Sequence, residues 1–155
     1  LIHAARHGIQ PLQTVQPPYN LVQRDIEADL LPLCVDRKVG VISYSPLAAG
    51  FLSGKYRRGR DVPPGSRFEV IPGHQPIYFT VHGYGVLGNL AGFARETGRS
   101  MIELALAWTL TRPNVTSVLI GARDVGQVDQ AFDASELSLP DEIFARLGTG
   151  SLKPG

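Results

Sequence analysis

Three short apolar segments, separated by stretches with helical patterning, constrain the fold of this chain more than any other feature. They cover residues 12–16, 39–44 and 116–120 and lie next to proline or glycine, as short buried strands commonly do. Strands that are joined through helices run parallel, because only a long connection can return the chain to the same end of the sheet. We therefore predict an α/β fold with a mainly parallel sheet.

Helical periodicity and helix-end signals predict the remaining elements. The first residues resemble the last turns of a helix that stops at Gly8, because glycine readily adopts the left-handed conformation at a helix end. Ser100 and Glu103 form a capping-box pattern at the start of a strongly apolar helix. The other helices are expected over residues 24–38, where Pro32 bends or divides the helix, over 86–97, 100–111 and 124–134, and after Pro140.

Three strands are too few to close a barrel. Parallel strands of this kind leave two edges without a partner, and a (β/α)8 barrel needs about five more strands. The chain also begins with leucine inside a helical pattern. We therefore predict that residues 1–155 form the C-terminal part of a (β/α)8 TIM barrel, a truncated domain with about three parallel strands and their helices. Self-association, or pairing with a complementary N-terminal half, would cover the open edges.

Composition narrows the class of partner. The 155 residues carry 15 basic and 14 acidic side chains, and this balance argues against a nucleic-acid binder. No apolar run approaches the roughly 18 residues of a membrane span, no signal peptide is visible, and the single Cys34 fits a reducing compartment. The four histidines lack the spacing of a metal site. We expect a cytoplasmic protein that binds a small molecule, with no metal.

The carboxyl ends of the three strands are where a barrel places its functional residues. Gln16 follows the first strand, and its amide supplies a donor and an acceptor together, although it serves equally well as a cap. Tyr44 ends the second strand and could stack on a planar ring or pack in the core. Gly121 and Arg123 follow the third strand just before a helix, a pattern that suits a phosphate but also fits a solvated arginine.

A long connection of residues 48–85 follows the second strand. It is rich in glycine and proline, and connections of this length are usually functional or mobile. Its basic residues include Lys55 and Arg67, which could close on a pyrophosphate or simply be solvated. We predict that this segment lies over the ligand site as a long loop.

Four motifs, in order and at matching spacings, carry a family resemblance. They are residues 15–21 (VQPPYNL), 43–56 (SYSPLAAGFLSGKY), 65–68 (GSRF) and 118–130 (VLIGARDVGQVDQ). Together they resemble the aldo-keto reductases, most closely the branch that includes the potassium-channel β subunits and bacterial relatives. The resemblance spans nearly the whole chain.

The resemblance implies an oxidoreductase in a (β/α)8 barrel that reduces aldehydes or ketones with NADPH, by hydride transfer from the nicotinamide and with a tyrosine as general acid. It implies that Gln16 holds the nicotinamide carboxamide and that Tyr44 stacks on the nicotinamide ring. The other residues that it assigns to the cofactor are Ser45, Pro46, Leu47 and Ala49 along the pyrophosphate, Lys55 and Arg67 as loop clamps, and Gly121, Arg123, Gln127 and Gln130 around the adenosine and its 2′-phosphate.

The chain also departs from the family pattern. Gln130 and Ala131 replace a Glu-Asn pair that contacts the adenine in many relatives, and Arg123 replaces a small polar residue and so favours NADP over NAD. None of the five tyrosines matches the catalytic motif, so no catalytic residue is predicted within the chain and the isolated chain is expected to be inactive. The alternatives are a non-catalytic NADP-sensing or regulatory subunit and a remnant without function.

Overall fold

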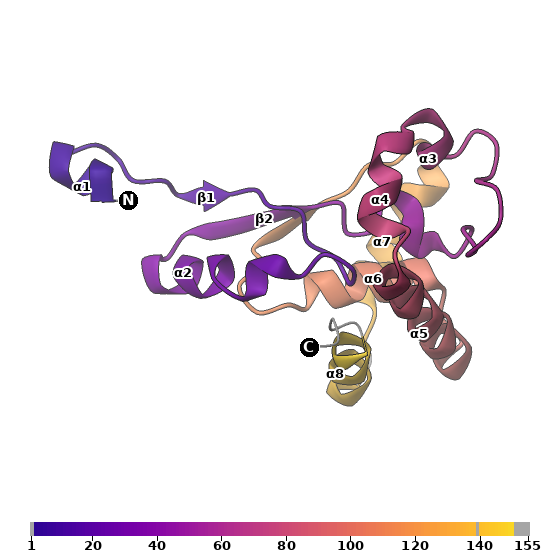
Figure 1. Cartoon of the computed structure of the whole chain (residues 1–155). Coiled ribbons are helices and arrows are strands. Elements are labelled where there is room, and N and C mark those ends of the chain that lie inside the picture. Colours follow the sequence, from indigo (N-terminus) through magenta and orange to yellow (C-terminus); the bar gives the residue numbers. More distant parts are fainter. Residues whose placement is uncertain (1, 139, 151–155) are drawn as a thin grey trace.

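The computed structural model describes residues 2–138 and 140–150 and contains a three-stranded parallel sheet (Figure 1). The strands are β1 (Thr14–Val15), β2 (Gly40–Tyr44) and β3 (Ser117–Leu119), in the order β1-β2-β3. Both pairings are parallel. The α/β class and the three strands are thus confirmed, although β1 and β3 are shorter than their apolar segments.

Helices connect and flank these strands. The short helix α1 (Ile2–His7) ends at Gly8, whose φ of 63° is the left-handed conformation predicted for this stop. Ser100 and Glu103 form the predicted capping box, with bonds of 3.1 and 2.8 Å. The longer helices are α2 (Leu30–Arg37), α5 (Val81–Thr97), α6 (Met101–Leu110), α7 (Val125–Glu136) and α8 (Asp141–Thr149); the shorter ones are η1 (Asp25–Glu27), η2 (Ala48–Ser53), α3 (Arg67–Val70), η3 (Pro72–His74) and α4 (Gln75–Tyr78).

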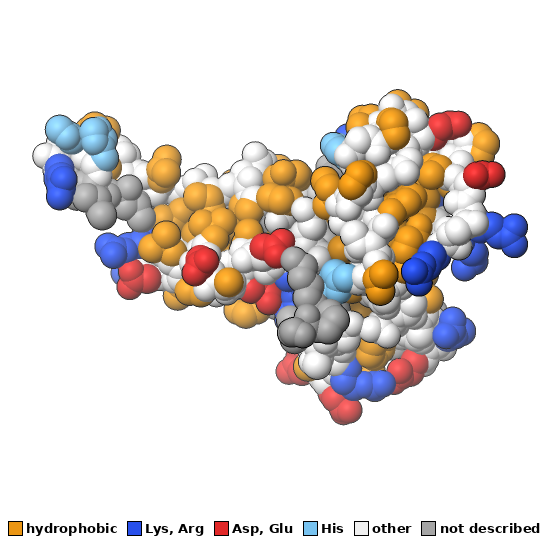
Figure 2. Space-filling view, viewed as in Figure 1, with side chains coloured by type: hydrophobic (Ala, Val, Ile, Leu, Met, Phe, Trp, Pro, Cys, Tyr) orange, Lys and Arg blue, Asp and Glu red, His pale blue; other side chains and the backbone are white. Residues whose placement is uncertain are grey.

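One face of the sheet is covered by helices and the other is open. Helix α2 packs on β2 and α6 packs on β3, and both lie below the strands in Figure 1. Val41 and Ser43 on the covered face are fully buried, whereas Tyr44 on the opposite face is 42% exposed. Figure 2 shows hydrophobic side chains gathered over these strands. Within the described residues, β1 and β3 each have a strand on one side only.

Two predicted segments differ from the structure. The helix expected over 24–38 is divided into η1 and α2, and Pro32 falls in the first turn of α2, where a missing N–H is tolerated. The segment 48–85 is not one open loop, because it contains short helices and the start of α5. Helix α5 begins at Val81 rather than near residue 86, since the Thr80 side chain caps it by accepting the N–H of Gly83 at 2.9 Å.

Aromatic packing explains why residues 48–85 fold into short helices. Phe51, Tyr56 and Phe68 are almost fully buried. The Tyr56 ring packs against the rings of Phe51 and Phe68, and the Tyr78 ring packs against the same two phenylalanines. Such burial is worth about 1.5–3 kcal/mol for each large side chain. Helical periodicity cannot reveal it, because each helix in this segment is only one or two turns long.

Arg24 connects the residues after β1 to α8 and forms an ion pair with Glu27. The Arg24 guanidinium binds both carboxylate oxygens of Glu27 at 2.8 Å, and it also donates to the carbonyl of Gly148 in α8. The hydroxyl of Tyr19 donates to Glu27 Oε1 at 2.5 Å. Burial alone would raise the pKa of Glu27, but the hydrogen bonds from Arg24 and Tyr19 outweigh it and hold the pKa below its usual value.

Because of this ion pair, we expect Glu27 to stabilise the folded state at neutral pH and to lose that effect in acid. Because the folded-state pKa of Glu27 lies below the unfolded value, its contribution is present above about pH 4.5 and is lost as the pH falls through the folded pKa. Glu27→Gln should therefore lower the free energy of unfolding by about 1 kcal/mol at pH 7 and by much less near pH 3. Urea denaturation of both proteins at the two pH values measures this. An equal loss at both pH values would contradict it.

Candidate functional site

The carboxyl ends of the three strands lie at one edge of the sheet. The residues after β1 continue along β2, where Pro18 bridges to Tyr44 and the N–H of Tyr19 donates to the Tyr44 carbonyl at 3.1 Å. On the other side Tyr44 pairs in register with Leu119, the last residue of β3. The strand ends that carry Gln16, Tyr44 and Gly121 are therefore neighbours, as parallel pairing requires.

The segment that follows β2 has an unusual backbone. Ser45, Ala48 and Ala49 have φ values of 55°, 52° and 56°, and Gly50 has 89°. The left-handed region costs a residue with a side chain about 1–2 kcal/mol. Strain of this kind persists only where surrounding contacts impose it, and it is concentrated at binding sites. The backbone around Ser45 is thus held in a shape that its own sequence does not favour.

The loop before α3 brings basic side chains toward this segment. The Lys55 ammonium lies 3.7 Å from the position that a β-carbon on Gly50 would take, and 5.3 Å from the centre of the Tyr56 ring. Arg67 is exposed at the first turn of α3, which packs against η2. Figure 2 shows Lys and Arg side chains at the end of the molecule where Figure 1 draws this loop.

The start of α7 contains a closed set of hydrogen bonds. The Asp124 carboxylate accepts the Gln127 N–H at 3.0 Å and the Gln127 side-chain amide at 2.8 Å. The side-chain oxygen Oε1 of Gln127 accepts the backbone N–H of Arg123 at 3.1 Å. The Arg123 guanidinium remains exposed, and no atom of the described residues lies within 4 Å of the position that a β-carbon on Gly121 would take. Both ends of the Gln127 amide are therefore used in capping the helix.

The sequence-predicted residues thus fall into two groups. Those that follow β1 and β2 share the strand-end region, whereas those that follow β3 lie along the exposed start of α7. Within residues 2–138 and 140–150, the side chains of Gln16, Tyr44, Arg67 and Arg123 make no hydrogen bond or ion pair. The first group contains Gln16, Tyr44, Ser45, Pro46, Leu47, Ala49, Lys55 and Arg67; the second contains Gly121, Arg123, Gln127 and Gln130.

The tyrosines are poorly suited to donate protons. Burial raises the pKa of Tyr19, and a hydrogen bond to Glu27 raises it further. Burial also raises the pKa of Tyr78 and Tyr84. Tyr56 is almost fully buried, and its hydroxyl makes no hydrogen bond to any described residue. Of the five tyrosines, only Tyr44 is exposed at the strand ends.

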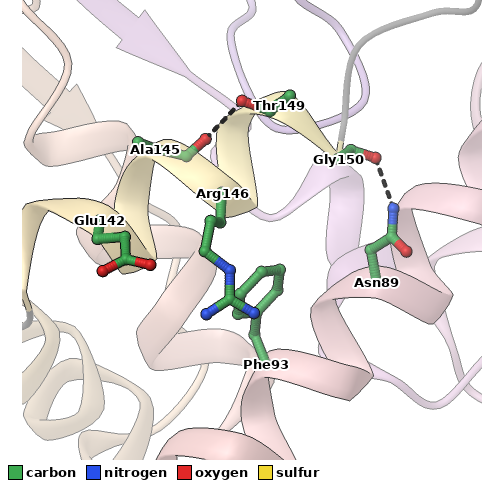
Figure 3. Close-up of a pocket in the computed structure, with 7 residues that line it drawn as sticks. All are labelled: Asn89, Phe93, Glu142, Ala145, Arg146, Thr149 and Gly150. Atoms are coloured by element: carbon green, nitrogen blue, oxygen red, sulfur yellow. Dashed lines mark hydrogen bonds between the residues drawn. The ribbon is translucent and has the colours of Figure 1, made fainter.

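A shallow pocket lies elsewhere on the molecule. Between α5 and α8 a pocket of about 440 Å³ is lined by Asn89, Phe93, Glu142, Ala145, Arg146, Thr149 and Gly150 (Figure 3). The Arg146 guanidinium lies over the Phe93 ring, 5.0 Å from its centre, and is paired with Glu96 at 2.8 Å. No residue predicted for the ligand site lines this pocket.

Within the part of the chain that the structure describes, no three His, Cys, Asp or Glu side chains lie close enough together to hold a metal ion. No helix in residues 2–138 and 140–150 is both long enough and apolar enough to cross a membrane.

Asn20 is the residue at this site whose role the sequence did not reveal. It is fully buried. Its side-chain oxygen accepts the N–H of Val22, and its side-chain nitrogen donates to the carbonyl of Ser45. An Asn in a turn after a strand is ordinary turn composition. Its partner Ser45 is 25 positions away, so only the fold brings the two together.

Comparison with known proteins places this geometry in context. Residues 1–149 match the model of the aldo/keto reductase family. The chain is 37% identical to an L-glyceraldehyde 3-phosphate reductase of Escherichia coli over 94% of its length, and 34% identical to a probable voltage-gated potassium channel subunit beta of Oryza sativa over 83%. These matches cover 45% and 40% of the relatives, so the chain spans less than half of their length.

A solved structure gives a similar result. The chain superposes on a glycerol dehydrogenase from Gluconobacter oxydans with a TM-score of 0.72 and 30% identity. The match covers 93% of this chain and 43% of that one.

Proposed function

The chain belongs to the aldo/keto reductase family, with an α/β fold that forms part of a TIM barrel, and from this premise we propose that it supplies the NADP-binding part of a carbonyl reductase. The observation that carries the proposal is the convergence of Gln16, Tyr44 and the strained segment from Ser45 at one sheet edge, with Arg123 exposed beyond β3. When bound, NADPH supplies a hydride to the carbonyl carbon of an aldehyde or ketone.

The residues present fit a dinucleotide phosphate. The left-handed segment after β2 and the Lys55 ammonium beside it offer backbone groups and a positive charge for the pyrophosphate. The open space at Gly121 permits close approach of a ligand to the backbone. The exposed Arg123 guanidinium, in a planar fork, suits the 2′-phosphate that distinguishes NADP from NAD.

Each group of residues has a separate task in this proposal. Gln16 binds the nicotinamide carboxamide through a matching donor and acceptor, and Tyr44 stacks on the nicotinamide ring. Ser45, Pro46, Leu47 and Ala49 line the pyrophosphate path, and Lys55 and Arg67 close over it. Gly121, Arg123 and Gln130 border the adenosine end, where Gln127 holds the Arg123 backbone through the α7 cap.

None of the five tyrosines of this chain suits the role of proton donor. A general acid for carbonyl reduction needs an accessible hydroxyl with a pKa near the working pH. Raised pKa values at Tyr19, Tyr78 and Tyr84 and the burial of Tyr56 oppose that role, and Tyr44 is assigned to the ring. The catalytic groups therefore come from a complementary part of a barrel.

The uncovered sheet face supports such a complement. The outer edges of β1 and β3 have no strand beside them in the described residues, and Tyr44 and Leu119 are exposed on the open face. A second half of a barrel, or a second copy of the chain, would pair with these edges and cover the face.

A cytoplasmic location of the protein stays a prediction.

An assay with NADPH and an aromatic aldehyde tests whether the chain binds the cofactor without catalysing the reduction. We expect the 155-residue chain to bind NADPH, seen as a change in cofactor fluorescence, and not to oxidise it when the aldehyde is added. Steady oxidation would contradict the absence of a proton donor. A folded chain that leaves NADPH fluorescence unchanged at all concentrations would contradict the cofactor site.

A further inference from the structure

We propose that Asn20 is a positioning residue that holds the segment from Ser45 to Gly50 in its ligand-binding shape. The inference rests on the proposed cofactor site, because it assigns a support to one part of that site. The claim that Asn20 holds the backbone after β2 can be tested without any cofactor. Asn20 itself is fully buried and is not placed against the cofactor.

The side chain of Asn20 uses its full hydrogen-bonding capacity. Its Oδ1 accepts the N–H groups of Val22 and Gln23, both at 2.9 Å. Its Nδ2 donates to the carbonyl of Ser45 at 3.0 Å and lies 3.5 Å from Oε1 of Gln23. A buried amide with all four positions used is fixed in one orientation, since any rotation would leave a polar atom unpaired.

The Ser45 carbonyl is the point where this amide acts on the strained segment. That oxygen also accepts the N–H of Ala48 at 2.9 Å, which closes the turn in which Ser45 and Ala48 have positive φ. A second turn follows at once, with the N–H of Gly50 donating to Leu47 at 2.9 Å. Because residues with side chains resist the left-handed region, this turn needs an external contact to hold it. Asn20 provides that contact.

A further bond connects the same turn to α4. The hydroxyl of Tyr78 donates to Oε1 of Gln23 at 2.7 Å, so the turn that begins at Asn20 is bonded both to the end of β2 and to the helix at the end of the long connection. The bond from Tyr78 to Gln23 therefore holds the turn in place, and the bond from Asn20 to the Ser45 carbonyl connects this turn to the segment after β2.

Two variants separate the donor of Asn20 from its acceptors. Asn20→Asp keeps both acceptor bonds to Val22 and Gln23 but has no N–H for the Ser45 carbonyl, whereas Asn20→Ala removes every side-chain bond. Gln23→Glu is the matched control, because it adds a charge in the same turn and still offers an acceptor to Tyr78. Hydrogen exchange at the amides of Ala48 and Gly50 reports the segment directly, and titration with NADPH and NADH reports the ligand site.

We expect both Asn20 variants to exchange these two amides at least about tenfold faster than the wild-type chain. We also expect them to bind NADPH and NADH about tenfold more weakly, with the ratio of the two affinities unchanged, because the pyrophosphate is common to both. Gln23→Glu should leave exchange and affinities within about twofold. Helix α7 should exchange as in the wild type.

Several results would overturn the inference. One such result is an Asn20→Asp variant with wild-type exchange and affinities beside an Asn20→Ala variant with changed ones. The bonds that Asn20 accepts would then hold the segment, and the bond that it donates to Ser45 would not. Unchanged exchange at Ala48 and Gly50 in both variants would also overturn it, as would faster exchange throughout the chain, which would signal general unfolding. A wild-type chain that bound neither cofactor would refute the proposed function, and the exchange data would still decide the role of Asn20.

Discussion

Replacing Trp108 with alanine is expected to cost about 3–5 kcal/mol of the free energy of unfolding. Trp108 is fully buried in α6, the helix that packs against α5, α7, α8 and β3. Its ring lies 5.5 Å from that of Tyr19, and the guanidinium groups of Arg24 and Arg112 lie 5.1 and 4.8 Å from its centre. Alanine would leave a cavity at the meeting point of these elements and would remove both cation contacts.

Two control variants make this prediction specific, and urea denaturation measures all of them. Trp108→Phe should cost much less, because it keeps an aromatic ring and removes a buried indole N–H that has no hydrogen-bond partner among the described residues. Phe132→Ala, at a side chain that is 66% exposed on α7, should change stability by less than about 0.5 kcal/mol. A loss below about 1 kcal/mol for Trp108→Ala would contradict the central place of α6 in the core.

Replacing Arg123 with alanine is expected to weaken NADPH binding by about tenfold to a hundredfold and to leave NADH binding nearly unchanged. The guanidinium is exposed beside the start of α7 and makes no hydrogen bond or ion pair within the described residues. It is therefore available to a 2′-phosphate, and a charge-assisted fork to that group is lost in the variant. Fluorescence titration with each cofactor gives the two dissociation constants.

The neighbouring carboxylate supplies an opposite test. Asp124→Asn keeps a good helix cap at α7 and removes a negative charge next to Arg123, so NADPH affinity should rise by a few-fold while NADH affinity stays constant. Arg95→Ala, at an exposed position on α5, controls for the loss of any positive charge. Equal weakening of NADPH and NADH by Arg123→Ala would contradict the assignment of Arg123 to the 2′-phosphate.

Local signals predicted much of the fold. The three strands were visible because each is a short apolar run beside a proline or glycine, and Gly8 and the pair Ser100 and Glu103 marked helix ends that the structure confirms. The helix expected over 24–38 is divided, but the break lies before Leu30 and not at Pro32, which the first turn of α2 accommodates. In each case the determining interaction lies within a few residues of the signal.

What the sequence did not reveal depends on contacts between distant residues. The short helices within 48–79 are stabilised by burial of Phe51 and Phe68 against Tyr56, and no periodic pattern records that burial. The strand-end residues could be predicted because parallel pairing places strand ends together. Their support by Asn20 could not, since the Ser45 carbonyl reaches it only through the fold.

The most direct test of the proposed cofactor site is a fluorescence titration of the folded 155-residue chain with NADPH, with NADH in parallel. We expect saturable binding of both cofactors, with NADPH bound more tightly because the 2′-phosphate reaches Arg123. A chain whose circular dichroism shows the expected helix content but which binds neither cofactor would contradict the claim that this part of the barrel forms the cofactor site.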